Sequence, residues 1–457
     1  MINIKSDSRK INRGDIFVAL KGISSNGEDY VDEAIKRGAS KIVVESDNKY
    51  LVDTLKVNDT RKYLNEYLDH NYSKVLSDMK IIGLTGTNGK TTTCYLVYQI
   101  LNLLGYKCGY IGTVGFYLDK KISSLPNTSP DICELYDMIT TSYELGYKYI
   151  VMEASSQGLD MGRFSNIKFD IAAFTNLTQD HLDYHKTFEN YAKAKQILFK
   201  KLKNNGISIL NSDDKYYNYF LYGNIFYYGL NGNDYKISNI KLGYKTEFDI
   251  TINNKIYNVE SNLLGEYNIY NLVCAIAIVN KLNIDIDSII STIKKITTPP
   301  GRMDLVRFKD NLIIIDYAHT PDAMKNIYDT VNKIKKGNVY TIFGCTGDRD
   351  RTKRPLMLSL ALNNSIYSII TSDDLHNEEF DSIIKDMFIN NKKNNYSIVK
   401  DRAEAIKRGM SLLKHNDILL LLGKGHEEFI IVKDKKIPFN DKNEVLKIIN
   451  ESKSIKI

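Results

Sequence analysis

Tryptophan is absent from the 457-residue sequence, and it has few cysteines, no long apolar run and no block of like charge. The five cysteines are odd in number and form no Cys-x-x-Cys pair, which argues against a disulfide framework and a zinc site. No run reaches the roughly 18 apolar residues of a membrane span, and the N-terminus lacks the pattern of a secretion signal. We therefore expect a cytoplasmic protein without a membrane span.

The charge balance does not indicate a nucleic-acid partner. Lys+Arg 62 against Asp+Glu 55 leaves a net charge of +7, but the basic residues are scattered among acidic ones. Aromatic residues beside Lys215 could stack bases, yet packing of a Tyr-rich domain surface explains them more simply. These residues are Tyr216, Tyr217, Tyr219 and Tyr222.

The chain is long enough for about three domains, and 43% hydrophobic residues suffice for a core in each. Short strand-like runs predict a small N-terminal α/β domain over residues 1–78. The clearest break is Thr-Thr-Pro-Pro-Gly at 297–301, because two prolines and a glycine continue neither a helix nor a central strand. We therefore predict a central domain over 79–300 and a C-terminal domain over 301–457.

Apolar runs predict parallel α/β sheets in both larger domains. In the central domain, residues 80–84 predict a strand and 91–104 a helix, while the runs at 149–153 and 169–174 lead into polar residues. This pattern is typical of a doubly wound sheet with functional carboxyl ends. In the C-terminal domain, four runs alternate with helix-like stretches and predict a Rossmann-like α/β fold; they lie at 312–316, 339–343, 366–370 and 418–422.

The most informative motif is Thr-Gly-Thr-Asn-Gly-Lys-Thr-Thr at 85–92, between a predicted strand and a predicted helix. Its glycines allow backbone N–H groups to wrap an anion at the positive end of the helix. Lys90 would meet the terminal phosphates, and Thr91 a magnesium ion. The motif is a shortened relative of Gly-x-x-x-x-Gly-Lys-Ser/Thr, because Leu84 stands where the first glycine belongs. ATP or GTP is the expected ligand; an ordinary glycine turn is the alternative.

Lys195 stands out because it falls on the apolar face of a predicted helix over 188–202, whereas Lys193 and Lys200 face the other way. Burial lowers the pKa of a lysine, and a neutral amine can add carbon dioxide to give a carbamate that binds a metal. From periodicity alone, an ammonium that reaches solvent along its stem is the favoured alternative.

Polar residues at the predicted sheet edge could bind a hard cation. Glu153 ends one apolar run, and His181 follows another in Thr-Asn-Leu-Thr-Gln-Asp-His at 175–181. Oxygen and nitrogen ligands of this kind suit Mg²⁺. Each residue could instead stabilise its loop by hydrogen bonds.

Several motifs in one order resemble those of the Mur ligases of bacterial peptidoglycan synthesis, over nearly the whole chain. Besides the phosphate loop and residues 175–185, the matching stretches are Asp-Ser-Arg at 7–9, Met-Glu-Ala-Ser-Ser at 152–156, Tyr-Ala-Lys-Ala-Lys at 191–195, Gly-Arg-Met-Asp at 301–304, Asp-Tyr-Ala-His-Thr-Pro-Asp-Ala at 316–323, Gly-Cys-Thr-Gly-Asp-Arg-Asp at 344–350 and Gly-Lys-Gly-His-Glu at 423–427.

The resemblance implies a role for each matching residue. Lys195 matches the lysine that the family carbamylates, and the implied catalytic residues are Lys90, Lys195 and Arg302. The implied metal ligands are Thr91, Glu153, His181 and the Lys195 carbamate. The implied ATP site comprises Gly86, Thr87, Asn88, Gly89, Lys90, Thr91, Asn271, Arg302, Asp316 and His319. The implied UDP-substrate site comprises Ser8, Thr128, Ser129, Ser155 and Arg163. The implied amino-acid site comprises Arg349, Asp373, His376, Gly423 and Glu427.

The implied reaction is ATP-dependent amide formation. A carboxylate of UDP-N-acetylmuramoyl-L-alanyl-D-glutamate attacks the γ-phosphate of ATP, and a diamino acid then displaces phosphate from the acyl phosphate. Mg²⁺, Lys90 and Arg302 would neutralise the charge that gathers where the two anions meet. Either the departing phosphate or Glu427 could take the proton of the amine. We expect a monomer.

The sequence departs from the family at Asp373-Asp374-Leu375-His376, which replaces the Asp-Asn-Pro-Arg of enzymes that add meso-diaminopimelate. His376 cannot reproduce the bidentate grip of an arginine on a carboxylate. We therefore expect L-lysine or another diamino acid. Alternative readings are a related ligase, such as folylpolyglutamate or cyanophycin synthetase, and a non-catalytic regulator on the same fold.

Overall fold

The computed structural model describes residues 3–22, 26–178, 180–243, 245–433 and 435–454. The chain forms two compact units, one up to residue 237 with 250–256 and 270–292, and the other from the remaining residues. In the described part of the chain, no helix is both long and apolar enough to cross a membrane.

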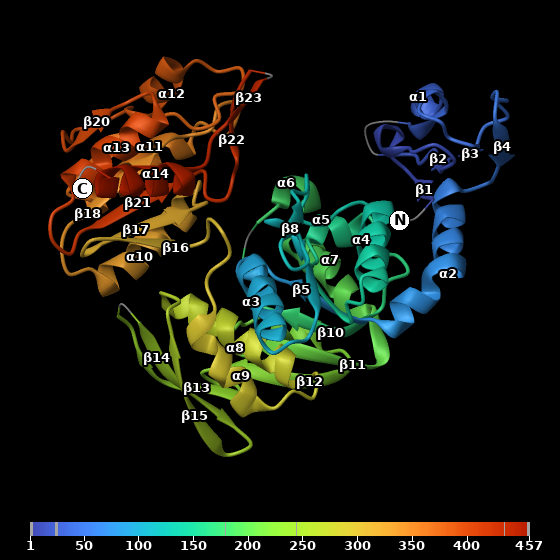
Figure 1. The fold of residues 1–457 in the computed structure, drawn as a ribbon, viewed down its shortest axis with the longest axis horizontal. Coiled ribbons are helices and arrows are strands. Elements are labelled where there is room, and N and C mark those ends of the chain that lie inside the picture. The colour runs from blue at the N-terminus through green and yellow to red at the C-terminus, as the bar shows by residue number, and fades with distance from the viewer. Residues whose placement is uncertain (1–2, 23–25, 179, 244, 434, 455–457) are drawn as a thin grey trace. The chain divides into compact units, whose positions relative to one another are not determined.

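The N-terminal region is a small parallel sheet in the order β1-β2-β3-β4, shown in blue in Figure 1. Phe17 and Ile42 on its strands pack with Ala34 on a short helix, so this region has a core of its own. A long helix then leads into the central sheet. The elements are β1 (Ile4–Lys5), β2 (Ile16–Val18), β3 (Lys41–Val44), β4 (Asp53–Lys56), α1 (Val31–Lys36) and α2 (Thr60–Asp78).

The central sheet has the order β15-β14-β13-β12-β11-β10-β5-β9-β6-β7-β8. Its middle strands are parallel, so their carboxyl ends share one edge. The strands are β5 (Lys80–Thr85), β6 (Cys108–Gly112), β7 (Gly115–Tyr117), β8 (Lys121–Ser123), β9 (Tyr149–Glu153), β10 (Phe169–Phe174), β11 (Leu202–Asn211), β12 (Asn224–Gly229), β13 (Tyr235–Lys241), β14 (Thr246–Ile252) and β15 (Lys255–Ser261).

Helices accompany the central strands, and the sequence predicted two of them, at 91–104 and 188–202, with one correction. They are α3 (Lys90–Leu103), α4 (Ile132–Glu144), α5 (Ser156–Asp160), α6 (Leu182–His185), α7 (Phe188–Lys200), α8 (Glu266–Asn280) and α9 (Ile286–Thr292). The predicted helix over 188–202 is too long. It ends at Lys200 because Leu202 pairs with Phe169 and begins β11.

The C-terminal sheet has the order β16-β17-β21-β18-β19-β20 and is parallel except for β16. Its strands are β16 (Asp304–Phe308), β17 (Asn311–Asp316), β18 (Val339–Phe343), β19 (Tyr367–Ile370), β20 (Tyr396–Ile398) and β21 (Ile418–Leu422), beside a separate pair, β22 (Phe429–Val432) and β23 (Lys435–Pro438). The helices are α10 (Pro321–Ile334), α11 (Lys353–Asn364), α12 (Phe380–Met387), α13 (Arg402–Leu412) and α14 (Asp441–Ser454).

Alternate residues of β17 face two different cores. Leu312 and Ile314 pack with α10, α11 and α12, whereas Ile313 and Ile315 pack with α13 and α14. Because successive side chains of a strand point to opposite faces, a sheet covered on both sides needs this continuous apolar run. The three-layer arrangement confirms the predicted Rossmann-like fold (Figure 1).

Candidate functional site

The phosphate loop lies between β5 and α3, with its glycines where side chains cannot fit. Gly89 has φ +85°, and a β-carbon there would lie 2.4 Å from Oδ1 of Asn271. Asn271 on α8, which the family resemblance assigns to the ATP site, therefore lies against the loop. Lys90 donates from Nζ to the carbonyl oxygens of Gly86 and Thr87, both at 2.9 Å. Next along the loop, the Asn88 amide donates to Oδ1 of Asn176 at 2.9 Å.

Lys195 on α7 is only 1% exposed, so the alternative in which its ammonium reaches solvent is wrong. Its Nζ donates to the Gly86 carbonyl oxygen at 2.7 Å and lies 4.5 Å from the ring centre of Tyr191. Burial lowers the pKa of Lys195 well below that of an exposed lysine, and the nearby charge of Lys90 lowers it further. A buried amine with a lowered pKa fits the chemistry of carbamate formation.

Glu153 ends β9 with a fully buried carboxylate that accepts four hydrogen bonds. Oε1 accepts from the Tyr110 hydroxyl at 2.6 Å and the Thr113 amide at 2.8 Å. Oε2 accepts from the Thr91 hydroxyl at 2.9 Å and the Thr113 hydroxyl at 3.1 Å. A carboxylate beside a hydroxyl at the phosphate loop is a hard oxygen donor set, and this set fits Mg²⁺.

His181, the third predicted metal ligand, has other neighbours. It is half-exposed, has φ +52°, and its Nε2 lies 3.5 Å from Oδ2 of Asp180. Its ring centre is 6.2 Å from that of Tyr191, the residue that Lys195 also contacts. The structure thus joins Thr91 directly to Glu153 and places His181 beside Tyr191.

Four of the five predicted UDP-substrate residues adjoin Glu153. The Ser129 hydroxyl donates to the Glu153 carbonyl oxygen at 3.0 Å and lies 3.0 Å from the Ser155 hydroxyl. The Thr128 hydroxyl is 3.1 Å from that of Thr113, and Arg163 donates to the Ser129 carbonyl oxygen.

The fifth, Ser8, lies in the N-terminal region and donates to Oε2 of Glu33 at 2.7 Å. The hydroxyl of Ser8 lowers the pKa of Glu33, since it stabilises the carboxylate.

The other predicted ATP residues surround Tyr317 after β17. The Arg302 guanidinium lies 5.1 Å from the Tyr317 ring centre, and its buried Nε has no hydrogen-bond partner among the described residues. Asp316 accepts from the amides of Met303 and Ala318 at 2.7 and 2.8 Å. His319 shares a 2.8 Å hydrogen bond between Nδ1 and the Tyr317 carbonyl oxygen, and burial lowers its pKa.

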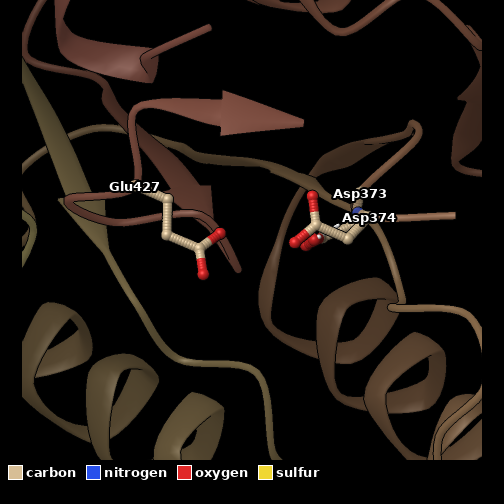
Figure 2. Close-up of side chains that lie close together, drawn as sticks. All are labelled: Asp373, Asp374 and Glu427. Carbon is tan, nitrogen blue, oxygen red and sulfur yellow. Dashed lines mark hydrogen bonds between the residues drawn. The ribbon is translucent and has the colours of Figure 1, made fainter. Parts of the chain in front are cut away.

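Three carboxylates gather at the carboxyl ends of β19 and β21. Figure 2 shows Asp373, Asp374 and Glu427, and their oxygens lie within 4.8 Å of one another. Lys424, which is 0% exposed, donates to Oδ1 of Asp374 at 2.8 Å and pairs with Glu427. Gly423 has φ +108°, and a β-carbon there would meet Asp373 at 2.5 Å. Burial raises the pKa of Glu427, while Lys424 opposes this rise.

This acidic cluster, defined by Asp373, Asp374, Lys424 and Glu427, was predicted only in part. The sequence assigned no role to Asp374 or Lys424, although Lys424 lies in a quoted motif. The cluster also does not include Arg349, which is exposed on a loop. His376 is half-buried, has φ +49°, and pairs through its backbone with Val432 on β22.

Two residues at the start of α11 hold three loops through hydrogen bonds, and the sequence did not predict these contacts. Lys353 donates from Nζ to the His319 carbonyl oxygen at 2.9 Å. Fully buried Arg354 donates to both oxygens of Glu378 at 2.9 and 2.7 Å, and to the Thr346 carbonyl oxygen at 3.2 Å. The loops after β17, β18 and β19 are therefore attached to two adjacent side chains.

These features define a class of multidomain α/β proteins, in which a sheet with a phosphate loop is followed by a second sheet with an acidic cluster at its carboxyl edge. Family models match residues 2–79 (Mur ligase family, catalytic domain), 84–279 (Mur ligase middle domain) and 301–425 (Mur ligase, glutamate ligase domain). The chain belongs to the Mur ligase family of ATP-dependent amide ligases.

Similar proteins extend over the whole chain. The UDP-N-acetylmuramoyl-L-alanyl-D-glutamate–2,6-diaminopimelate ligase of Clostridium botulinum is 39% identical over 98% of this chain and 95% of its own. A solved ligase structure of the same name is 30% identical, covers 98% of this chain and 95% of its own, and has a TM-score of 0.70. The solved structure of the MurF ligase of Thermotoga maritima in complex with ADP is 19% identical, covers 100% of this chain and 98% of its own, and has a TM-score of 0.70. At this identity the similarity supports the fold alone.

Proposed function

We propose that this protein is an ADP-forming ligase that adds 2,6-diaminopimelate to UDP-N-acetylmuramoyl-L-alanyl-D-glutamate. The observation that carries this proposal is full-length similarity, at 39% identity over 98% of the chain, to a ligase of that name. The comparisons do not support the preference for L-lysine expected from His376, and they point to 2,6-diaminopimelate instead.

The phosphate loop supports the ATP part of this proposal. Lys90 and Arg302 are the cations for the phosphates, and Asn271, Asp316 and His319 are the groups for the base and ribose. Thr91 and Glu153 would hold Mg²⁺, with His181 as a further ligand after a local change of its exposed loop. When bound, the metal would neutralise phosphate charge.

A carbamate on Lys195 is the further metal ligand in this proposal. Its neutral amine forms a C–N bond with carbon dioxide and loses one proton, which turns a basic side chain into an acidic one. Because Nζ contacts the Gly86 carbonyl oxygen, the new carboxylate would lie at the phosphate loop. It would serve there as a further oxygen ligand.

The remaining residues bind the other two substrates. Ser8, Thr128, Ser129, Ser155 and Arg163 are the proposed contacts of the UDP-linked acceptor. The acceptor carboxylate attacks the γ-phosphate and releases ADP, and the amine then displaces phosphate from the acyl phosphate. The raised pKa of Glu427 suits a base for that amine, and the departing phosphate is the other candidate.

The acidic cluster suits an amino acid with two ammonium groups. Its three carboxylates outnumber Lys424, the buried lysine that pairs with Asp374 and Glu427, so the cluster attracts further positive charge. Arg349 and His376 are the proposed partners of the amino-acid carboxylates. We further propose that residues 1–78, 79–300 and 301–457 correspond to acceptor, ATP and amino-acid domains.

ADP release with the UDP-linked dipeptide and separate amino acids tests the proposal. The expected result is turnover with meso-2,6-diaminopimelate, measured as kcat/KM, that exceeds turnover with L-lysine and L-ornithine. A higher kcat/KM with L-lysine would overturn the choice of amino acid. Absence of amide product with every amino acid would overturn the ligase.

A further inference from the structure

Tyr110 is the closest hydrogen-bond donor to Glu153. Its hydroxyl lies 2.6 Å from Oε1, against 2.9 Å between the Thr91 hydroxyl and Oε2. The two carboxylate oxygens thus have different partners. Tyr110 and the Thr113 amide hold Oε1, while Oε2 accepts from the Thr113 hydroxyl and from the Thr91 hydroxyl of the phosphate loop.

The ring of Tyr110 is fixed from several sides. The residue is 0% exposed on β6, and three other tyrosine rings pack around it. Tyr95 and Tyr117 meet the Tyr110 ring edge-on with centres 5.8 Å away, and Tyr98 lies at 6.4 Å. Edge-to-face packing of this kind restricts the ring.

Gly112 shows how tightly this hydrogen bond is enclosed. A β-carbon at Gly112 would lie 2.2 Å from Oε1 of Glu153 and 2.4 Å from the Tyr110 hydroxyl oxygen. Both distances are shorter than any packed contact allows. The space beside the carboxylate is therefore occupied by the Tyr110–Glu153 pair, and glycine is the residue that fits next to it.

We propose that Tyr110 is a positioning residue: it fixes Oε1 of Glu153 so that Oε2, beside Thr91, is presented to the divalent cation that accompanies the nucleotide. This inference rests on the proposed role of Glu153 as a metal ligand. Hydrogen-bond partners of a metal ligand orient it, and their removal typically lowers metal affinity about 10-fold to 100-fold. Tyr110 does not itself contact the metal.

A pair of hydroxyl deletions tests the proposal. Tyr110→Phe removes the donor to Glu153, whereas Tyr98→Phe removes a hydroxyl from the same ring cluster that donates to the Leu118 carbonyl oxygen at 2.5 Å. The probe is Mn²⁺ in the presence of ADP, titrated by electron paramagnetic resonance on the full chain. We expect Tyr110→Phe to weaken Mn²⁺ binding by at least about 10-fold and Tyr98→Phe to leave it within about 2-fold. Metal-free ADP binding should change in neither variant.

Further variants keep the outcomes separable. Gly112→Ala should weaken Mn²⁺ binding as Tyr110→Phe does, because its methyl group parts the two side chains without removing either. Glu153→Gln tests the part of the proposed function in which Glu153 is a metal ligand. It should abolish Mn²⁺ binding in the same titration. If Glu153→Gln binds Mn²⁺ like the wild type, Glu153 is not a metal ligand. The positioning role proposed for Tyr110 is then overturned as well. If Glu153→Gln abolishes binding while Tyr110→Phe and Gly112→Ala match the wild type, only the positioning role is overturned.

Discussion

The Lys195 amine donates a 2.7 Å hydrogen bond to the carbonyl oxygen of Gly86, so a buried side chain of α7 ends on the phosphate loop. This contact connects α7 to a loop more than a hundred residues earlier in the chain. It also places a lysine with a lowered pKa near the charge of Lys90.

Lys195→Ala should lower the ligation rate by at least about 100-fold, the scale on which loss of one preorganised charged group acts. Wild-type activity should fall in carbon-dioxide-free buffer and return with bicarbonate, because the amine must be carbamylated. The matched control is Lys193→Ala on the same helix. That exposed lysine pairs with Glu189 at 2.9 Å, and its loss should change the rate less than 2-fold. Bicarbonate-independent wild-type activity would contradict the carbamate.

Replacing Lys195 with methionine should stabilise the folded protein at neutral pH. The folded-state pKa of Lys195 lies well below 10.5, so between the two values the unfolded chain binds a proton that the folded chain lacks. Wild-type stability therefore rises with pH in this window, by about 1.4 kcal/mol per pH unit. The advantage of Lys195→Met should shrink as pH approaches 10.5. Urea unfolding across this range in carbon-dioxide-free buffer measures it, and parallel curves would exclude the lowered pKa.

Lys424→Met should destabilise the protein by about 3–5 kcal/mol, because it leaves the buried carboxylate of Asp374 and the half-buried carboxylate of Glu427 without their cation. The double variant with Asp374→Asn should recover part of this loss. Lys442→Met is the control: its ammonium pairs with Asp304 at 2.8 Å but is 40% exposed, so the cost should stay within about 1 kcal/mol. Denaturant unfolding measures the free energy of unfolding of each variant. Equal losses would mean that the ion pairs of Lys424 contribute no more than an ordinary surface pair.

His376→Arg should lower the KM for meso-2,6-diaminopimelate by about 10-fold, since a guanidinium can grip a carboxylate through two hydrogen bonds. L-lysine, which lacks the second carboxylate, serves as the internal control and should show no comparable gain. Initial rates of ADP release with each amino acid measure both constants. An equal gain for the two substrates would indicate a general charge effect.

The parallel strands were predictable because strands covered on both faces are continuous apolar runs. Four predicted runs coincide with β9, β10, β18 and β21. The strands β13 and β14 were not predicted, because their buried positions alternate with polar ones, as at the buried Thr246, Phe248 and Ile250 of β14. The sequence there is rich in Asn, Lys and Tyr, and this composition hides the alternation.

The candidate site was predictable only where one motif lies in one segment. The phosphate loop and its lysine are local, and the apolar spacing of α7 singled out Lys195. The Lys424–Asp374 pair joins residues 50 positions apart, and the Tyr110–Glu153 hydrogen bond joins residues 43 apart. Such pairs depend on strand order, which spacing along the chain does not give.

The helix start at Lys353 and Arg354 has a pharmacological consequence. A small molecule that wedged this helix away from its loops would displace the His319 segment and the Glu378 segment together. It would need no likeness to nucleotide or amino acid, because it would bind at the helix start and act on the substrate sites through these loops.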